Sequence, residues 1–436
     1  MGKGQDLYWK ARKRIPGGTQ LLSKRPEMLL PETWPSYFSR VKGVEVWDLD
    51  GRHYIDMSYN AIGACVLGAG DPDVDAAVHA AIDSGVASTL NCPEEVELAD
   101  LLCELHPWAD MVRYTRSGGE AMAVAVRIAR ARTGRDRIAL CGYHGWHDWY
   151  LAANLAEEKA LDGHLLPGLQ PAGVPRGLKG TALPFHYNQI AELRAIMEKY
   201  GSEIAAIVME PVREHMPEPG FLEEVREVAV QKGAVLIFDE ITSGFRLTTG
   251  GAHMLFGVSP DIAVFAKAMG NGYAIAAVIG KGDVMQAAQT SFISSTNWTE
   301  RIGPAAALAT IRKHRKFNVA EHLIRIGNRV KAGWEEAARR TGLSIHVSGI
   351  ASLGHFSLLY DNAQVLRTLF TQLMLERGYL AANAFYATFA HQDSHVDAYI
   401  KAVEDCFGVM VKAQAEGGAE SLLKGPVAHA GFRRLT

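Results

Sequence analysis

Long hydrophobic runs and a sizeable net charge are both missing from this sequence. Its apolar segments have the length of strands, whereas a helix that spans a membrane needs about 20 consecutive apolar residues. The 45 basic and 48 acidic side chains leave a formal charge of −3, which gives no electrostatic attraction to nucleic acid or to an anionic membrane. We therefore expect neither a nucleic acid nor a membrane among the partners of this protein.

Cysteine pairs and metal-ligand patterns are also missing. The five cysteines are scattered and form no Cys-x-x-Cys pair, and free thiols are typical of a reducing compartment. The first 14 residues are polar and contain no apolar core of the kind found in secretory signals. His144 and His147 stand three apart, but no carboxylate or cysteine set at ligand spacing accompanies them. We expect a cytoplasmic protein with free thiols and no bound metal.

Short apolar runs alternate with helix-like segments through the middle of the chain. The runs cover residues 137–143, 204–210, 234–240, 262–267 and 275–280, and the helix-like segments between them include 121–133, 190–201 and 220–233. Strands that are apolar along their whole length are typical of a parallel sheet with helices on both faces. The sequence therefore predicts an α/β fold built on a mainly parallel central sheet.

The two ends of the chain predict a second, smaller unit. The segment "VEVWDLDGRHYIDM" alternates apolar and polar residues on either side of an Asp-Leu-Asp-Gly turn, which predicts a hairpin. After about residue 305 the pattern changes to long helices, one with a stripe formed by Leu323, Ile326, Val330, Trp334 and Ala337. We expect residues 61–305 to form a large domain, and residues 1–60 and 306–436 to form a small α+β domain.

Polar side chains follow four of the predicted strands. Asp239 ends one apolar run and Lys267 ends the next, while Glu210 and the pair Tyr143 and His144 follow two others. Ligands of open α/β sheets bind beyond the carboxyl ends of the strands. A buried ion pair between Asp239 and Lys267 would explain two of these groups but not all of them, so the pattern favours a ligand site.

The tripeptide Ser117-Gly118-Gly119 stands directly before a helix-like segment. The free N–H groups and the positive end of a helix attract phosphate, and glycines let the phosphate approach closely. The same tripeptide can also be an ordinary helix cap. On the tripeptide alone, both interpretations stay open.

A lysine, a carboxylate, an aromatic ring and a phosphate seat are together the groups that pyridoxal phosphate requires. The lysine amine forms a Schiff base, and the carboxylate keeps the pyridine nitrogen protonated so that the ring accepts electrons. Tyr143 would stack on one face of the ring and Ile241 would cover the other. Asp239 and Lys267 would then flank the ring, too far apart for a direct ion pair.

Several motifs in the same order resemble those of class III pyridoxal-phosphate-dependent aminotransferases, in particular the branch that contains the glutamate-1-semialdehyde aminomutases. They are "RIPGGTQ", "VKGVEVWDLDGRHYIDM", "SGGEAMAVAVRIAR", "YHGWHD", "MEPV", "LIFDEITSGFR" and "FGVSPDIAVFAKAMGNGYAIAAVIG". The resemblance covers nearly the whole length. It implies the fold-type-I architecture with a mainly parallel, seven-stranded sheet, a transaminase activity, and pyridoxal phosphate as the cofactor.

The resemblance also implies a role for individual residues. Lys267 matches the Schiff-base lysine, which also moves the proton between substrate and cofactor, and Asp239 matches the partner of the pyridine nitrogen. Thr296 stands where the family has a threonine that reaches the phosphate of the neighbouring subunit, which implies a homodimer or larger assembly with shared sites. The cofactor-binding residues implied in this way are Ser117, Gly118, Gly119, Tyr143, His144, Glu210, Asp239, Ile241, Lys267 and Thr296.

The substrates are less well marked. The resemblance implies transfer of an amino group from an amino acid, L-glutamate above all, to an aldehyde or ketone. The aminomutase branch holds a carboxylate with an arginine shortly after Ile-Pro-Gly-Gly, where this sequence has Lys24 and Arg25. Its Gly-Gly-Gly after the lysine is "GNG" here, with Asn271 in the middle. These departures argue against true aminomutase activity, although intramolecular amine transfer stays an alternative, as do other Schiff-base reactions on the same scaffold.

The rest of the sequence resembles sugar-modifying members of this branch, such as those that make 8-amino-3,8-dideoxy-octulosonate for lipopolysaccharide. An oxo-sugar acid is therefore a candidate acceptor. Trp146 and His147 are candidate substrate contacts, in addition to Lys24 and Arg25. They belong to a polar and aromatic segment that would suit a polyhydroxylated acceptor, with ordinary core packing as the alternative; its members are His144, Trp146, His147, Asp148, Trp149 and Tyr150.

Overall fold

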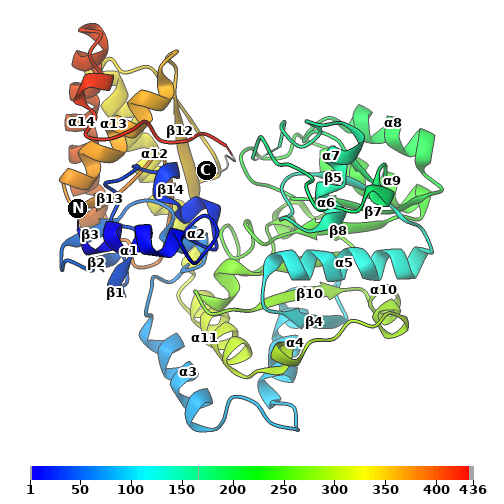
Figure 1. Ribbon diagram of the computed structural model, residues 1–436. Coiled ribbons are helices and arrows are strands. Elements are labelled where there is room, and N and C mark those ends of the chain that lie inside the picture. Colours follow the sequence, from blue (N-terminus) through cyan, green and yellow to red (C-terminus); the bar gives the residue numbers. More distant parts are fainter. Residues whose placement is uncertain (1, 165, 432–436) are drawn as a thin grey trace. The chain divides into compact units, whose positions relative to one another are not determined.

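A computed structural model describes residues 2–164 and 166–431 and divides into two compact units (Figure 1). The larger unit is Pro72–Ala320, and the smaller one combines Met1–Asp71 with Glu321–Thr436. The domain limits expected after residues 60 and 305 stay a prediction. Within the described ranges, no helix has the length and hydropathy needed to cross a membrane.

The large unit contains a sheet of seven strands in the order β4-β10-β9-β8-β7-β5-β6. Their bounds are β4 Met111–Thr115, β5 Arg137–Cys141, β6 Ala182–Pro184, β7 Ile204–Met209, β8 Val235–Asp239, β9 Ile262–Phe265 and β10 Ala276–Gly280. Strands β6, β5, β7, β8 and β9 run parallel to one another, and β10 is antiparallel to both β9 and β4. The predicted mainly parallel sheet is confirmed, and all five apolar runs are strands.

The central strands are buried on both faces because helices cover each side of the sheet. Alternate residues of a strand point to opposite faces. Val208 and Ile237 pack into a core with residues of α5 (Gly118–Thr133), whereas Ile207 and Leu236 pack into a second core with residues of α8 (Ile190–Tyr200) and α9 (Phe221–Lys232). All four side chains are fully buried. This two-sided burial explains why these strands are apolar throughout.

The rest of the large unit consists of helices and the loops that join them (Figure 1). Its remaining α-helices are α3 Pro72–Asp83, α4 Pro93–Leu105, α6 Asp148–Leu151, α7 Ala153–Ala156, α10 Gly282–Met285 and α11 Ile302–Lys316. Its short 3-10 helices are η3 Arg176–Leu178, η4 Ala252–Phe256, η5 Lys267–Gly270, η6 Gln286–Thr290 and η7 Thr296–Thr299. Helix α11 packs against α3 and α4, and an ion pair of 2.7 Å between Arg301 and Glu94 joins the starts of α11 and α4.

The small unit is an α+β structure in which the two chain ends share a sheet. Its strands are β1 Phe38–Lys42, β2 Glu45–Asp48, β3 His53–Asp56, β11 Ile345–Ser348, β12 Leu353–Leu358, β13 Tyr379–Leu380 and β14 Ala384–Tyr386. Strands β2 and β3 form the predicted hairpin, and β13 pairs with β3 in parallel. This pairing ties the C-terminal segment to the N-terminal one.

Helices cover the sheets of the small unit. They are α1 Lys3–Arg12, α2 Asn60–Gly63, α12 Val319–Thr341, α13 Ala363–Glu376 and α14 Asp393–Ala415, with 3-10 helices η1 Leu22–Lys24, η2 Pro26–Met28 and η8 Glu420–Leu422. The stripe predicted on α12 is buried, and Trp334, its largest side chain, is 0% exposed. The indole N–H of Trp334 donates to the Tyr399 hydroxyl of α14 at 3.0 Å, so α12 and α14 are joined by both apolar and polar contacts.

Candidate active site

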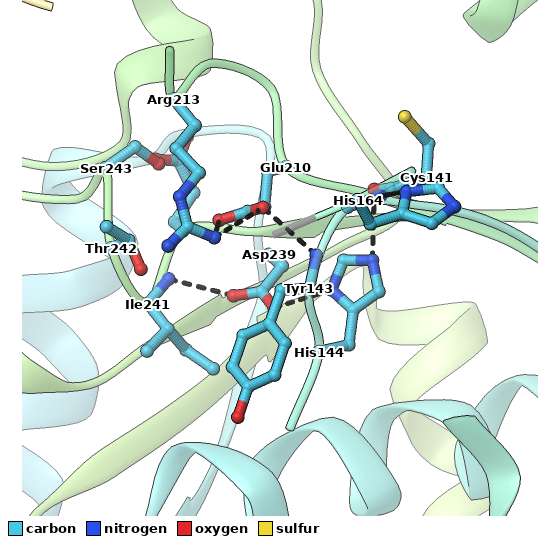
Figure 2. A network of polar contacts seen from close by, with 12 residues as sticks. Cys141, Tyr143, His144, His164, Glu210, Arg213, Asp239, Ile241, Thr242 and Ser243 are labelled. Carbon is cyan, nitrogen blue, oxygen red and sulfur yellow. Dashed lines mark hydrogen bonds and ion pairs between the residues drawn. The ribbon is translucent and has the colours of Figure 1, made fainter. Parts of the chain in front are cut away.

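The carboxyl ends of β5, β7, β8 and β9 bring the expected polar residues to one edge of the sheet. Figure 2 shows Tyr143, His144, Glu210 and Asp239. Asp239 is the last residue of β8, and Lys267 follows β9 directly as the first residue of η5. Tyr143 and His144 follow β5, and Glu210 follows β7. These strands are neighbours in the sheet, which is why residues up to 124 positions apart along the chain meet.

Asp239 is held by His144. The carboxylate is 3% exposed; its Oδ2 lies 2.8 Å from His144 Nδ1, and its Oδ1 accepts the Ile241 N–H at 3.0 Å. His144 Nε2 lies 3.1 Å from the Cys141 carbonyl oxygen. Because a carbonyl only accepts, the proton of this second contact lies on Nε2. The His144 side chain is fully buried against this carboxylate, and its role in binding the cofactor stays a prediction.

Lys267 is a buried amine aimed at a hydroxyl. Its Nζ donates to Thr242 Oγ1 at 2.9 Å. Burial, together with the positive charge of Arg213, lowers the pKa of Lys267 to about 8. Its backbone has a φ of +42°, in the left-handed region that costs energy for a residue with a side chain. Among the described residues no ion pair joins Lys267 to Asp239, as required if the two flank a ring.

The Glu210 carboxylate accepts hydrogen bonds from Arg213 and Tyr143. Its two carboxylate oxygens accept from Arg213 Nη1 at 3.0 and 3.1 Å, and Oε2 also accepts the Tyr143 N–H at 3.2 Å. Sequence reasoning did not select Arg213 or Thr242, although both lie within the quoted motifs or next to them. The only signals were a charge three residues after Glu210 and a hydroxyl three residues after Asp239.

The start of α5 has the form expected of a phosphate seat, with one qualification. The N–H and the hydroxyl of Ser117 both donate to Glu120 Oε2, at 3.0 and 3.1 Å, so Ser117 is also an ordinary helix cap. A Cβ on Gly118 would lie 2.8 Å from Ile241 Cδ1, and one on Gly119 would lie 2.7 Å from His147 Cε1. A side chain at either position would displace Ile241 or His147, and the first N–H groups of a helix have no partner within it.

The segment after His144 is divided between the core and the surface. Trp149 and Tyr150 are 6% and 1% exposed, and the Tyr150 hydroxyl donates to the Gly142 carbonyl at 3.0 Å. With the buried His144, they favour core packing for this part of the segment, and a role in an acceptor pocket stays a prediction. Trp146, at 70% exposed, stacks on His147 with ring centres 4.2 Å apart.

Other predicted residues lie elsewhere. Thr296 is exposed at the start of η7 in the large unit, and Lys24 and Arg25 belong to the small unit, at the end of η1 and directly after it. Glu240, which follows Asp239, points away into a separate buried contact, where its Oε1 accepts from His253 Nδ1 at 2.8 Å. Burial would raise the pKa of Glu240, but hydrogen bonds from His253 and Ser243 hold it below its ordinary value. Glu240 is structural.

The residues fit the cofactor that the resemblance implies. A helix start that needs glycine could receive a phosphate, a buried carboxylate could face a pyridine nitrogen, and an amine with a lowered pKa could bond to a carbonyl carbon. The part of the chain that the structure describes contains no group of His, Cys, Asp and Glu suited to a metal ion.

Comparison with known protein families identifies the family of this chain. Residues 32–405 match the family described as aminotransferase class-III. The chain is a class III aminotransferase. Its cofactor is accordingly pyridoxal phosphate, and its partners are a small amino donor and a small carbonyl acceptor.

Relatives of this aminotransferase match along nearly their whole length. It is 32% identical over 425 residues to the 3-aminobutyryl-CoA aminotransferase of Cloacimonas acidaminovorans, covering 94% of this chain and 98% of the relative. It is 34% identical over 426 residues to the glutamate-1-semialdehyde 2,1-aminomutase of Syntrophobacter fumaroxidans, covering 92% and 96%. The expected similarity to aminomutases is thus confirmed, and the chain is also similar to an aminotransferase that is named for another substrate.

A solved structure confirms the fold type. The pyridoxal-phosphate form of the FumI protein of Sphingopyxis sp. MTA144 superposes with a TM-score of 0.86 at 26% identity. The match covers 95% of this aminotransferase and 98% of that protein. The central seven-stranded sheet therefore belongs to a fold-type-I transaminase.

Proposed function

We propose that this aminotransferase moves an amino group from L-glutamate to an oxo-sugar acid, such as a 3,8-dideoxy-8-oxo-octulosonate. The observation that carries the amine-transfer half of this proposal is the Lys267 amine, buried beside Thr242 and with a pKa lowered to about 8. The sugar-acid acceptor rests on the departures of the sequence from the aminomutase pattern.

In this proposal each residue has a separate task. When bound, pyridoxal phosphate supplies an electron sink that loosens the bonds of the carbon bearing the amine. Lys267 Nζ, with a pKa about 8, both accepts and releases a proton near neutral pH. Asp239 keeps its negative charge toward the pyridine nitrogen, and His144 behind it holds the carboxylate in place. The start of α5, with Gly118, receives the phosphate.

The proposal includes a homodimer or larger assembly in which Thr296 of one subunit reaches the phosphate of the other. It is supported by the exposure of Thr296 and by Leu90 and Phe292, which are 81% and 89% exposed in the same unit. Light scattering should give at least twice the chain mass, and Thr296→Val should weaken retention of the cofactor without changing that mass. A monomer that retains cofactor fully would contradict this part. A cytoplasmic location completes the proposal, supported by five cysteines without a disulfide.

The test separates transfer from the aminomutase alternative, which the relative at 34% identity favours. Loaded protein is mixed with L-glutamate alone, and 2-oxoglutarate is measured. We expect about one equivalent per subunit, and then turnover once an octulosonate 8-aldehyde is added. Isomerisation of glutamate-1-semialdehyde without release of 2-oxoglutarate would support the alternative, and an unreactive octulosonate aldehyde would refute the proposed acceptor.

A further inference from the structure

The turn that follows β8 joins an active-site residue to a group of buried side chains. It covers residues 241–251, all of them described and outside any helix or strand, and leads into η4. Thr242 on this turn accepts a hydrogen bond from Lys267 Nζ at 2.9 Å, and Figure 2 shows the start of the turn with Ile241, Thr242 and Ser243. Because such a turn lacks the regular backbone hydrogen bonds of a helix or strand, its side-chain contacts fix where the Thr242 hydroxyl lies.

The carboxylate of Glu240 closes the turn from the inside of the protein. Its Oε2 accepts from the Ser243 hydroxyl, and its Oε1 lies 2.9 Å from the backbone nitrogen of His253 and 2.8 Å from His253 Nδ1. The carboxylate is 1% exposed, and hydrogen bonds to a charged acceptor are stronger than those between neutral groups. One side chain thus connects the start of the turn to η4, which follows its end.

His253 extends this contact to a second segment of the large unit. The indole N–H of Trp108, which lies between α4 and β4, can only donate, and it lies 3.0 Å from His253 Nε2. Nε2 therefore accepts, and the ring proton lies on Nδ1, where it faces the Glu240 carboxylate. Both ring nitrogens of this fully buried histidine are used, so its orientation is fixed from two sides.

Close packing leaves these groups little freedom to rearrange. At the end of the turn, His106 Nε2 accepts the Gly251 N–H at 2.9 Å, and the His106 ring stacks on His253 with ring centres 5.8 Å apart. A Cβ on Gly251 would lie 2.3 Å from His253 Cε1 and 3.0 Å from Glu240 Oε1. Because closely packed groups transmit a displacement, a change at His253 should move the turn.

We propose that His253 is a positioning residue, which fixes the turn so that the Thr242 hydroxyl stays on the Lys267 amine. It acts through the carboxylate of Glu240 and the hydroxyl of Ser243 and is not itself a catalytic residue. A hydroxyl that accepts from an ammonium group stabilises the charged form, so displacement of the turn should lower the pKa of the amine. The inference concerns the amine chemistry of a class III aminotransferase and does not depend on the proposed acceptor.

The test measures the pKa of Lys267 from the pH dependence of the rate at which cofactor-free protein binds pyridoxal phosphate. His253→Phe removes both ring hydrogen bonds and should lower this pKa by at least about 0.5, since the hydrogen bond to Thr242 contributes about 1. His253→Asn, whose amide can place an N–H near the position of Nδ1, should recover at least half of the shift. Ser243→Ala removes the other side-chain donor to Glu240 and should lower the pKa in the same direction.

A double-substitution cycle separates positioning from a direct effect of charge. In Thr242→Val protein, His253→Phe should change the pKa of Lys267 by less than about 0.3, because the hydroxyl through which it acts is absent. A shift of the same size with and without Thr242 would overturn the positioning role.

His391→Phe is the matched control. His391 is also fully buried with both ring nitrogens in hydrogen bonds, but it belongs to the small unit. This substitution should lower the thermal unfolding midpoint as His253→Phe does and leave the pKa of Lys267 unchanged. Should His253→Phe fail to fold, Ser243→Ala carries the same comparison, because alanine is smaller than serine and leaves the two contacts of the His253 ring in place.

An unchanged pKa of Lys267 in folded His253→Phe or in Ser243→Ala would overturn the proposal and leave His253 as a residue of the core. None of these measurements uses an amino donor or an acceptor. Their failure would therefore leave the proposed function standing, and failure of the proposed function, seen as no release of 2-oxoglutarate from L-glutamate, would leave the role of His253 standing.

Discussion

Lys267→Met should stabilise the protein in its cofactor-free form, because the buried ammonium of Lys267 lowers the free energy of unfolding of the wild type. The pKa of Lys267 is lowered from 10.5 to about 8, and each pKa unit corresponds to 1.36 kcal/mol. The amine thus destabilises the folded chain by about 3 kcal/mol below pH 8. The variant also loses the hydrogen bond to Thr242, which lowers its stability by about 1 kcal/mol. The net gain in the free energy of unfolding is therefore about 2 kcal/mol.

The pH dependence of this gain follows from linkage. Between pH 8 and 10.5 the unfolded chain binds the Lys267 proton and the folded chain does not, so the wild type gains stability as the pH rises through this window. The advantage of Lys267→Met should therefore be largest below pH 8. Above pH 10.5 only the loss of the Thr242 contact should remain.

Urea unfolding of cofactor-free protein at pH 7, 9 and 10.5 measures this difference. Lys401→Met, at an exposed position of α14, is the control and should change the unfolding midpoint little at any pH. The reasoning would be refuted by a Lys267→Met variant less stable than wild type at pH 7, or by a difference that does not depend on pH.

Three other substitutions test the site. Thr242→Val removes the acceptor of the Lys267 ammonium and should lower the pKa of that amine by about 1, from about 8; the pH dependence of the rate at which cofactor-free protein binds pyridoxal phosphate measures it. Asp239→Asn removes the buried charge and should slow amine transfer at least about a hundredfold in single-turnover assays, with cofactor content nearly unchanged. Gly118→Ala places a Cβ 2.8 Å from Ile241 Cδ1, and dialysis should show faster loss of cofactor.

Two of these substitutions have a matched control, and all three have an outcome that would contradict them or serve as their comparison. Thr242→Ser retains the hydroxyl and should restore the wild-type pKa, so a pKa that stays the same in Thr242→Val would contradict the assigned contact. Gly177→Ala is the control for Gly118→Ala, since a Cβ there meets no atom within 4 Å. Amine transfer by Asp239→Asn within tenfold of wild type would argue against its role.

The apolar strands were predictable because burial on both faces leaves a continuous run of Val, Ile, Leu and Ala. The antiparallel direction of β10 was not, since a run such as Ala276–Gly280 reads the same in either direction. Strand β4 was missed because its side chains are only half buried up to Thr115, and β6 because it has three residues.

The sequence by itself determined that Tyr143, Glu210, Asp239 and Lys267 stand at strand ends, because a polar residue that closes a buried strand must lie at the sheet edge. Only the tertiary structure decided their partners. Strand order and register place His144 behind Asp239, and the turn after β8 places Thr242 under Lys267.

The sequence alone also could not predict that a cavity lies beside Tyr143. It is formed by His164, Tyr187 and Arg213 from three separate segments, and no spacing along the chain records that they meet. The buried state of Trp149 and Tyr150 was undecided for the same reason. Local pattern determines which groups reach the edge of a sheet, whereas their contacts depend on packing between segments distant in sequence.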